Sequence, residues 1–179
     1  MKSSCSMTPI EKSGLVNLSA TIAPLEAAIG DSHQGLPEDV FLFVSRITPL
    51  INVDLLIKDN AGRTLLTWRD DEFFGAGWHI PGGIIRYKEL AVDRIRACAL
   101  TELGAEVAFD SAPLLISENI RPHRSRGHFI SLLYRCQLLT PLDDARRASS
   151  TRPSAGMWSW HQGCPPDLIE AQAEYASFF

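Results

Sequence analysis

The residues of this chain that could do chemistry gather around the turn Pro81-Gly82-Gly83. The apolar run ending in Trp78-His79-Ile80 predicts a short strand, which the proline and the glycines should break. Residues 90–103 have a helix-forming composition, and Gly104 stands where a glycine would end that helix. A Gly-Gly turn that leads into a helix commonly brings main-chain groups and carboxylates close to phosphates or a metal ion.

This stretch resembles the signature of the Nudix hydrolases, Gly-x5-Glu-x7-Arg-Glu-U-x-Glu-Glu-x-Gly-U, in which U is a bulky aliphatic residue. The sequence matches the signature at Gly83, Glu89, Glu102 and Gly104. Where the signature has an arginine and two further glutamates, the chain has Ala97, Cys98 and Thr101. The resemblance implies an α/β protein, with an α/β/α sandwich built on a mixed, curved β-sheet.

The departures resemble those of the GDP-mannose mannosyl hydrolases, which also lack most of the signature glutamates. Their Ala/Thr-Glu-Leu-Gly ending is similar to Thr101-Glu102-Leu103-Gly104, and residues 36–54 resemble their opening helix and first core strand. The resemblance implies a homodimer that uses Mg²⁺, or Mn²⁺, to hydrolyse a nucleoside diphosphate sugar into nucleoside diphosphate and sugar. Two alternatives stay open: a pyrophosphatase that attacks phosphorus, and a nucleotide-sugar binding or sensing module without catalysis.

Glu102 and the carbonyl of Gly82 are the metal ligands that the resemblance implies. Helical spacing puts positions 98, 101 and 102 on one face, and of these only Glu102 has a carboxylate. One carboxylate is compatible with Mg²⁺, which is commonly held by one or two carboxylates together with waters and substrate phosphates. The alternative for Glu102 is an exposed charge at the helix end. Glu89 is expected to order the loop rather than to bind metal.

Asp54 and Arg69 are the candidate catalytic residues of the preceding segment. Asp54 interrupts the apolar strand 51–57, so its carboxylate must be hydrogen-bonded, exposed at a cleft, or on the solvent face. Arg69 ends a returning strand that begins at Thr64, which predicts a hairpin over residues 51–69. A guanidinium gives a phosphate two donors at once, and the alternative is a surface charge. By resemblance, Asp54 would contact the sugar and Arg69 the leaving phosphate.

The stretch from 118 to 128 is the most basic of the chain and could receive a diphosphate as a hairpin loop, the alternative being a solvated loop. Its candidate substrate ligands or catalytic groups are Glu118, Arg121, His123, Arg124, Arg126 and His128. Arg86 is a further candidate substrate ligand. Residues 152–156 lack the histidine that serves the subfamily as general base. The base would then be His123, His128, Glu118 or His161, or it would be absent.

The bulk properties predict a globular cytoplasmic protein. The 179 residues predict a partly disordered extension over residues 1–30 and a single domain over residues 31–179. A net charge of -4 argues against nucleic-acid binding, and no apolar run is long enough to span a bilayer. We expect no secretory signal. The four cysteines lack metal-ligand spacing, so we expect free thiols in a reducing compartment.

The remaining elements follow from local patterns. Helices are predicted over residues 15–30, from Pro37, and from Pro165 to the end. Strands are predicted over residues 106–109, 112–116, 129–139 and 157–161. A loop is predicted over residues 70–77.

Overall fold

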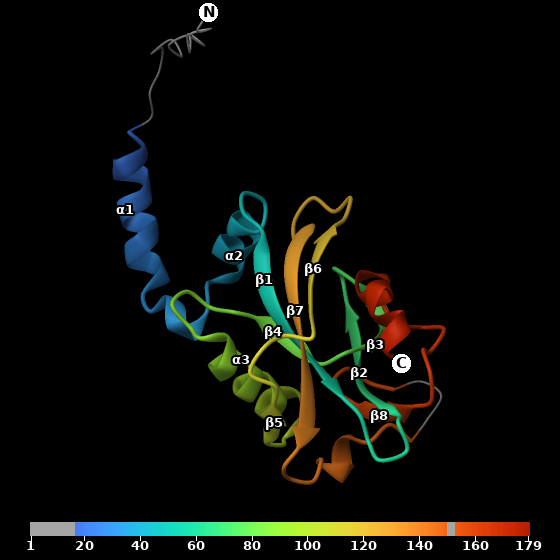
Figure 1. Cartoon of the computed structure of the whole chain (residues 1–179). Helices are drawn as coiled ribbons and strands as arrows, with labels where there is room; N and C mark the ends of the chain where they lie inside the picture. The colour runs from blue at the N-terminus through green and yellow to red at the C-terminus, as the bar shows by residue number, and fades with distance from the viewer. Residues whose placement is uncertain (1–16, 150–152) are drawn as a thin grey trace, which may run out of the picture.

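The computed structural model describes residues 17–149 and 153–179 (Figure 1). Its helices are α1 (Leu18–Ile29), α2 (Glu38–Val44) and α3 (Ala91–Cys98), the last continuing as a π-helical turn, η2 (Ala99–Leu103). Short 3₁₀ helices are η1 (Ser32–Gln34), η3 (Asp144–Arg146) and η4 (Glu170–Phe178). The strands are β1 (Leu50–Ile57), β2 (Thr64–Asp71), β3 (Gly75–His79), β4 (Gly82–Ile84), β5 (Val107–Phe109), β6 (Leu115–Ile120), β7 (His128–Leu138) and β8 (Trp158–His161).

Within the described residues, the strands form two sheets. In the larger sheet β1 runs parallel to the long strand β7, and β4 pairs antiparallel with the other edge of β1. β6 and β5 both pair antiparallel with β7, along the edge that β1 leaves free. The smaller sheet is antiparallel, in the order β3-β2-β8. The predicted mixed α/β fold is confirmed, although its strands divide between two sheets instead of forming one.

The predicted hairpin over residues 51–69 is wrong. A tight turn does join β1 to β2, with the Asp59 side chain accepting the N–H groups of Ala61 and Arg63. Beyond the bridge between Lys58 and Thr64, however, the two strands enter different sheets. β7 takes one edge of β1 over its whole length, and β4 takes the other edge at residues 52–54, where a longer hairpin would need β2.

Strand alternation gives β1 two different faces. Val53, Leu55 and Ile57 are fully buried against α3, whose Ile95 belongs to the same core. Leu56 lies on the opposite face, in a second core with Tyr175 of η4. Asn52 and Asp54 share that opposite face, because side chains two residues apart point the same way. Figure 1 shows α3 and η4 on different sides of the strands.

Several predicted boundaries shift. The loop predicted at 70–77 is mostly a hairpin, because β2 runs to Asp71 and β3 begins at Gly75. The strand predicted at 112–116 is β6, which runs to Ile120 and pairs with β7. The final helix begins at Glu170 rather than Pro165. The residues before it instead lie along β3, where the main chains of Trp78, Asp167 and Ile169 exchange hydrogen bonds.

The helix after the Gly-Gly turn is confirmed, since residues 91–103 are helical and Gly104 ends them in the left-handed conformation, with φ 63° and ψ 24°. α1 is also confirmed; it has no buried residue and extends away from the sheets (Figure 1). None of the helices described is long and apolar enough to cross a membrane.

Candidate active site

A cleft of about 190 Å³ opens between the two sheets. Four of the residues predicted for the site lie in its wall beside Gly83: Asp54, Arg69, Gly82 and Glu102. Arg126 is the residue of the basic stretch that joins them there. The wall is completed by groups that include Asn52, Phe74, His79, Asn119, Ser131 and Gln172.

Gly82 and Gly83 pack so closely that a Cβ at either position would force neighbouring atoms to move. The pairing of β4 with β1 places Gly82 opposite Asp54. A Cβ on Gly82 would overlap the carbonyl oxygen of Val53 and lie 2.6 Å from Asp54 Oδ1. A Cβ on Gly83 would lie 2.7 Å from Cys98 Sγ. These glycines therefore form the strand β4, not only the break that the sequence predicted, because they let the turn pack directly on β1 and α3.

Asp54 is buried in the wall of the cleft and does not lie on the solvent face. Its Oδ2 accepts hydrogen bonds from Tyr175 Oη at 2.6 Å and Asn52 Nδ2 at 2.9 Å. Its Oδ1 accepts a longer one from Gln172 Nε2, at 3.4 Å. Burial raises the pKa of Asp54 to about 7, against the lowering effect of the Tyr175 hydrogen bond. This carboxyl group therefore titrates close to neutral pH.

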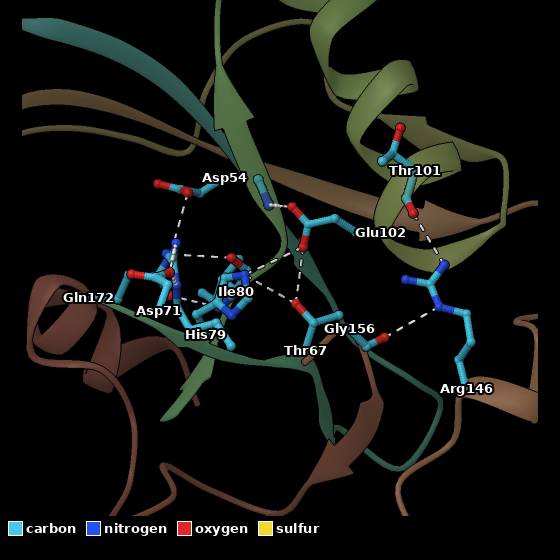
Figure 2. A network of polar contacts seen from close by, with 12 residues as sticks. Asp54, Thr67, Asp71, His79, Ile80, Thr101, Glu102, Arg146, Gly156 and Gln172 are labelled. Carbon is cyan, nitrogen blue, oxygen red and sulfur yellow. Dashed lines mark hydrogen bonds and ion pairs between the residues drawn. The ribbon is translucent and has the colours of Figure 1, made fainter. Parts of the chain in front are cut away.

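Glu102 connects the two sheets at the base of the cleft (Figure 2). Its Oε1 accepts the N–H of Gly82 at 3.1 Å, and its Oε2 accepts the hydroxyl of Thr67 at 3.1 Å. His79 Nε2 lies 3.4 Å from the same Oε2. Glu102 is thus tied to the Gly-Gly turn on one side and to β2 and β3 on the other.

The donor set around Glu102 fits a single Mg²⁺ ion. No group of three His, Cys, Asp or Glu side chains suited to a metal occurs among the described residues. A carboxylate has about four lone-pair sites, so Glu102 keeps acceptor capacity beyond its hydrogen bonds. In the pairing of β4 with β1, the Pro81 carbonyl accepts the Leu55 N–H and the Ile85 N–H donates to the Ile51 carbonyl. Gly82, opposite Asp54, therefore stands at a position whose main-chain groups point away from β1, so its carbonyl is not used in the sheet. One carboxylate and one carbonyl are a typical protein contribution to a Mg²⁺ site that is completed by substrate phosphates.

Cys98 and Glu102 both face the Gly-Gly turn, as predicted, but Thr101 does not share that face. Cys98 is buried against Gly83, and burial raises the pKa of its thiol to about 12, so it stays neutral. Thr101 is exposed, and its carbonyl accepts a hydrogen bond from Arg146 on the side away from Glu102 (Figure 2). The π-helical turn over residues 99–103 widens the helix, which changes the angle between Thr101 and the residues of α3.

Arg69 and Arg126 place two guanidinium groups in the cleft. Arg69 binds Asp71 through Nε at 2.7 Å and Nη2 at 2.6 Å. Burial alone would raise the pKa of Asp71, but the Arg69 charge and nearby hydrogen bonds lower it, so Asp71 is ionised. Arg69 is therefore not a simple surface charge.

Arg126 lies among three phenylalanine rings, 4.7 Å from the centre of Phe73, 4.9 Å from Phe74 and 5.5 Å from Phe41. Its backbone has φ 55°, and its N–H donates to Ser45 Oγ. Burial and the neighbouring Arg69 lower the pKa of its guanidinium. Its buried Nε has no hydrogen-bond partner among the described residues.

The other predicted ligands lie outside the cleft wall. Arg121 binds Glu170 at 2.7 Å, and His128 lies 3.0 Å from Glu118. His123 and Arg124 are exposed on the same hairpin, where the His123 ring contacts the main chain at Ser125. Arg121 also lies 6.0 Å from the centre of the Phe74 ring, at the rim of the cleft, and Arg126 is the basic residue of the hairpin that lines the cleft itself.

The residues that follow the Gly-Gly turn have structural partners. Arg86 Nη1 donates to the carbonyl of His33 at 2.7 Å. Glu89 orders this loop, because it accepts the Arg86 N–H at 2.8 Å and forms an ion pair with Arg94 at 2.8 Å. Glu89 does not line the cleft, and Gly104 serves as the helix end.

The histidine of the cleft is one that the sequence analysis did not select. His79 lies beside Thr67 and Glu102, with Nδ1 buried and without a partner among the described residues. His161 instead packs on Trp78, with 4.5 Å between ring centres, and burial lowers its pKa. Arg152, in the stretch examined for a base, lies outside the described residues. Asn52, Gln172 and Tyr175 were also missed: strand alternation beside Asp54 could have indicated Asn52, whereas only the packing of a distant segment brings Gln172 and Tyr175 to the site.

The comparison with solved structures defines the class of fold. The MutT Nudix hydrolase of Burkholderia pseudomallei has a TM-score of 0.57 at 21% identity, over 73% of this chain and 97% of that one. A possible asymmetric diadenosine tetraphosphate hydrolase of Jonesia denitrificans has a TM-score of 0.55 at 19% identity, over 70% of this chain and 89% of that one. The chain therefore has the fold of the Nudix hydrolases, which confirms the fold implied by the signature.

The sequence matches no family model. It is 33% identical over 76 residues to the low-salt glycan biosynthesis protein Agl8 of Haloferax volcanii, a match that covers 42% of this chain. The chain spans about half, 48%, of the length of that relative.

Proposed function

We propose that this chain is a Mg²⁺-dependent hydrolase of a nucleoside diphosphate sugar, similar to GDP-mannose, that releases nucleoside diphosphate and free sugar. One observation carries the proposal: a single cleft of the Nudix fold is lined by the guanidinium groups of Arg69 and Arg126 and by Glu102 and Gly82. The first pair suits a diphosphate and the second pair suits a metal ion. The partial likeness to a glycan biosynthesis protein agrees with a sugar-containing substrate.

The guanidinium pair supports the diphosphate part of the proposal. Arg69 and Arg126 bring two positive charges, and Asp71 offsets one of them. Two guanidinium groups side by side favour a ligand with negative charges on neighbouring phosphates. Because phenylalanine rings and Asp71 already fix both side chains, binding costs little side-chain ordering.

Glu102 and the Gly82 carbonyl would hold Mg²⁺. When bound there, the ion would neutralise charge that develops on the leaving diphosphate. The chain's own residues have distinct tasks: Arg69 and Arg126 donate hydrogen bonds to phosphate oxygens, and Asp54 accepts one from the sugar or the attacking water. With Glu102 assigned to the metal, Asp54 and His79 are the other ionisable proton acceptors in the cleft wall, so they replace His123, His128 and Glu118 as candidates for the base.

In the proposed reaction, water adds to the anomeric carbon. The bond from that carbon to the diphosphate oxygen breaks, its electron pair stays on the diphosphate, and a water proton passes to the base. The alternative attack at phosphorus is less well supported, because that route usually recruits more metal and the described residues offer no cluster of three metal-binding side chains.

The second candidate function, a nucleotide-sugar binding or sensing module, is favoured by one observation. Both oxygens of Glu102 already accept hydrogen bonds, from Gly82 and Thr67. In such a module Glu102 would only join the two sheets, and the cleft would bind a nucleotide sugar without turning it over.

The test is hydrolysis of a panel of nucleoside diphosphate sugars with and without Mg²⁺, with products identified by NMR. Nucleoside diphosphate plus free sugar would support the proposal and locate attack at carbon. Nucleoside monophosphate plus sugar phosphate would indicate attack at phosphorus. Binding without any product would favour the sensing module.

We also propose that the protein acts in the cytoplasm as a homodimer. α1 has no buried residue, and Leu18 and Ile22 expose 67% and 47% of their surface. A 12-residue helix gains little stability alone in water, so a second copy is the proposed cover for this apolar stripe. Light scattering of the wild type should give a dimer mass, and Ile22→Glu should give a monomer.

A further inference from the structure

The C-terminal segment reaches into the cleft from far along the chain. After β8 the main chain lies along the free edge of β3, where Trp78 N–H donates to the Asp167 carbonyl at 2.9 Å and Ile169 N–H donates to the Trp78 carbonyl at 2.9 Å. η4 then begins, and Gln172 and Tyr175 are its buried residues. The segment thus extends the smaller sheet and delivers two polar side chains to the larger one.

Gln172 acts on both sheets through one amide group (Figure 2). Its Oε1 accepts the N–H of Ile80 at 2.6 Å, and its Nε2 donates to the Ile80 carbonyl at 3.2 Å. The same Nε2 lies 3.4 Å from Asp54 Oδ1. Ile80 is the residue at which the chain leaves β3 to form the Pro81-Gly82-Gly83 turn. Gln172 therefore fixes the point where the chain passes from one sheet to the other.

Tyr175 completes this arrangement at the other oxygen of Asp54. Its hydroxyl donates to Asp54 Oδ2 at 2.6 Å, while its ring packs in the core with Leu56 and Leu133. Of the side-chain donors to Asp54, Asn52 comes from β1 itself and the others come from η4. A role in packing alone would need the aromatic ring but not its hydroxyl.

We propose that Gln172 and Tyr175 are positioning residues for the cleft: they hold the Asp54 carboxylate and the turn at Gly82 in fixed relation to each other. The inference rests on the proposed function in so far as it concerns turnover. Its physical basis is that Asp54 contacts the sugar or water while Gly82 and Glu102 contact the metal, so the reaction depends on their relative placement. A displacement of about 1 Å at such a site can cost roughly 100-fold in rate.

Tyr175→Phe and Gln172→Met test the proposal, since both keep most of the buried volume and remove the polar contacts. Each is expected to lower kcat by about 10- to 100-fold with KM changed less than about threefold, the pattern of lost positioning rather than lost binding. The matched control is Glu174→Gln on the same helix, whose carboxylate accepts a hydrogen bond from Ser117 at the surface, 3.0 Å away. It should leave kcat and KM unchanged. Wild-type kcat in both cleft variants would overturn the proposal.

A second measurement is independent of turnover, so that failure of the proposed function can be recognised separately. Amide hydrogen exchange at Gly82 and Leu55 reports on the turn, because these N–H groups bind Glu102 and the Pro81 carbonyl and do not contact Gln172. Gln172→Met should speed exchange at both amides about tenfold or more, while Glu174→Gln should not. If exchange at Gly82 is unchanged in Gln172→Met, the positioning role is overturned whether or not the wild type is an enzyme.

Discussion

Arg69 and Arg126 share the ring of Phe74: the centre of that ring lies 4.4 Å from the Arg69 guanidinium and 4.9 Å from that of Arg126. The two groups come from different sheets, Arg69 from β2 and Arg126 from the hairpin before β7. The two like charges repel each other, and Asp71, which binds Arg69, offsets part of that repulsion.

Arg126→Gln should weaken the binding of a nucleoside diphosphate by about 10- to 100-fold, because a hydrogen bond to a charged group contributes roughly 1.5–3 kcal/mol. Titration calorimetry at low salt measures the loss, and higher salt should shrink it. Arg124→Gln is the matched control, since Arg124 is exposed on the same hairpin. Equal losses in the two variants would mean a diffuse charge effect and no specific site.

Glu102→Gln should lower kcat for Mg²⁺-dependent turnover by about 100-fold or more, because the amide lacks the negative charge that would hold the ion. The amide oxygen can still accept the Gly82 N–H, so the melting temperature should change little. Initial rates across a Mg²⁺ titration are the measurement. Full activity in the variant would exclude Glu102 as the metal ligand.

The raised pKa of Asp54 predicts a pH-dependent stability. Between the ordinary value of 3.8 and about 7, the folded protein keeps a proton on Asp54 that the unfolded chain releases. The free energy of unfolding should therefore fall as the pH rises through this window, by at most a few kcal/mol, and become level above it. Urea unfolding at pH 5 and pH 8 measures the change. Asp54→Asn should remove this component, and an equal pH dependence in the variant would assign the effect to other groups.

Gly83 and Cys98 should be energetically coupled. Gly83→Ala alone should destabilise the protein by about 1–3 kcal/mol, because the new Cβ would lie 2.7 Å from Cys98 Sγ. Adding Cys98→Ala removes that sulfur, so the double variant should be less destabilised than the sum of the single variants. Urea unfolding of the complete double-mutant cycle gives the coupling energy. Strict additivity would show that the turn relaxes away from α3.

The sequence predicted most directly the part of the site that is local in sequence, while Asp54 and Arg69 were predicted by resemblance. The Gly-Gly turn, the helix and its glycine end form one continuous signature, so Gly82 and Glu102 were identified together. Thr101 was misplaced because a π-helical turn leaves no reliable mark in residue composition. The apparent hairpin over residues 51–69 failed for a related reason, since a tight turn does not determine which strands pair beyond it.

His79 and Gln172 show why the rest could not be predicted. His79 reaches Glu102 because β3 pairs with β2 in a register that aligns it with Thr67. Gln172 reaches Ile80 across 92 positions of sequence, through a segment whose composition predicted only a helix. The sequence of the hairpin offers six charged or ionisable residues, and only the fold decides that Arg126 is the one that lines the cleft.

The separation between Asp54 and its donors also has a consequence for how the chain acquires its structure. Gln172 and Tyr175 are 118 and 121 residues further along, so during synthesis β1 is made long before these donors exist. Contacts of such long range form slowly, because closing the intervening loop costs entropy before any contact can repay it. Until the C-terminal segment docks, Asp54 lacks the Gln172 and Tyr175 donors and the second core lacks the Tyr175 ring, so we expect the cleft to be among the last regions of the fold to form.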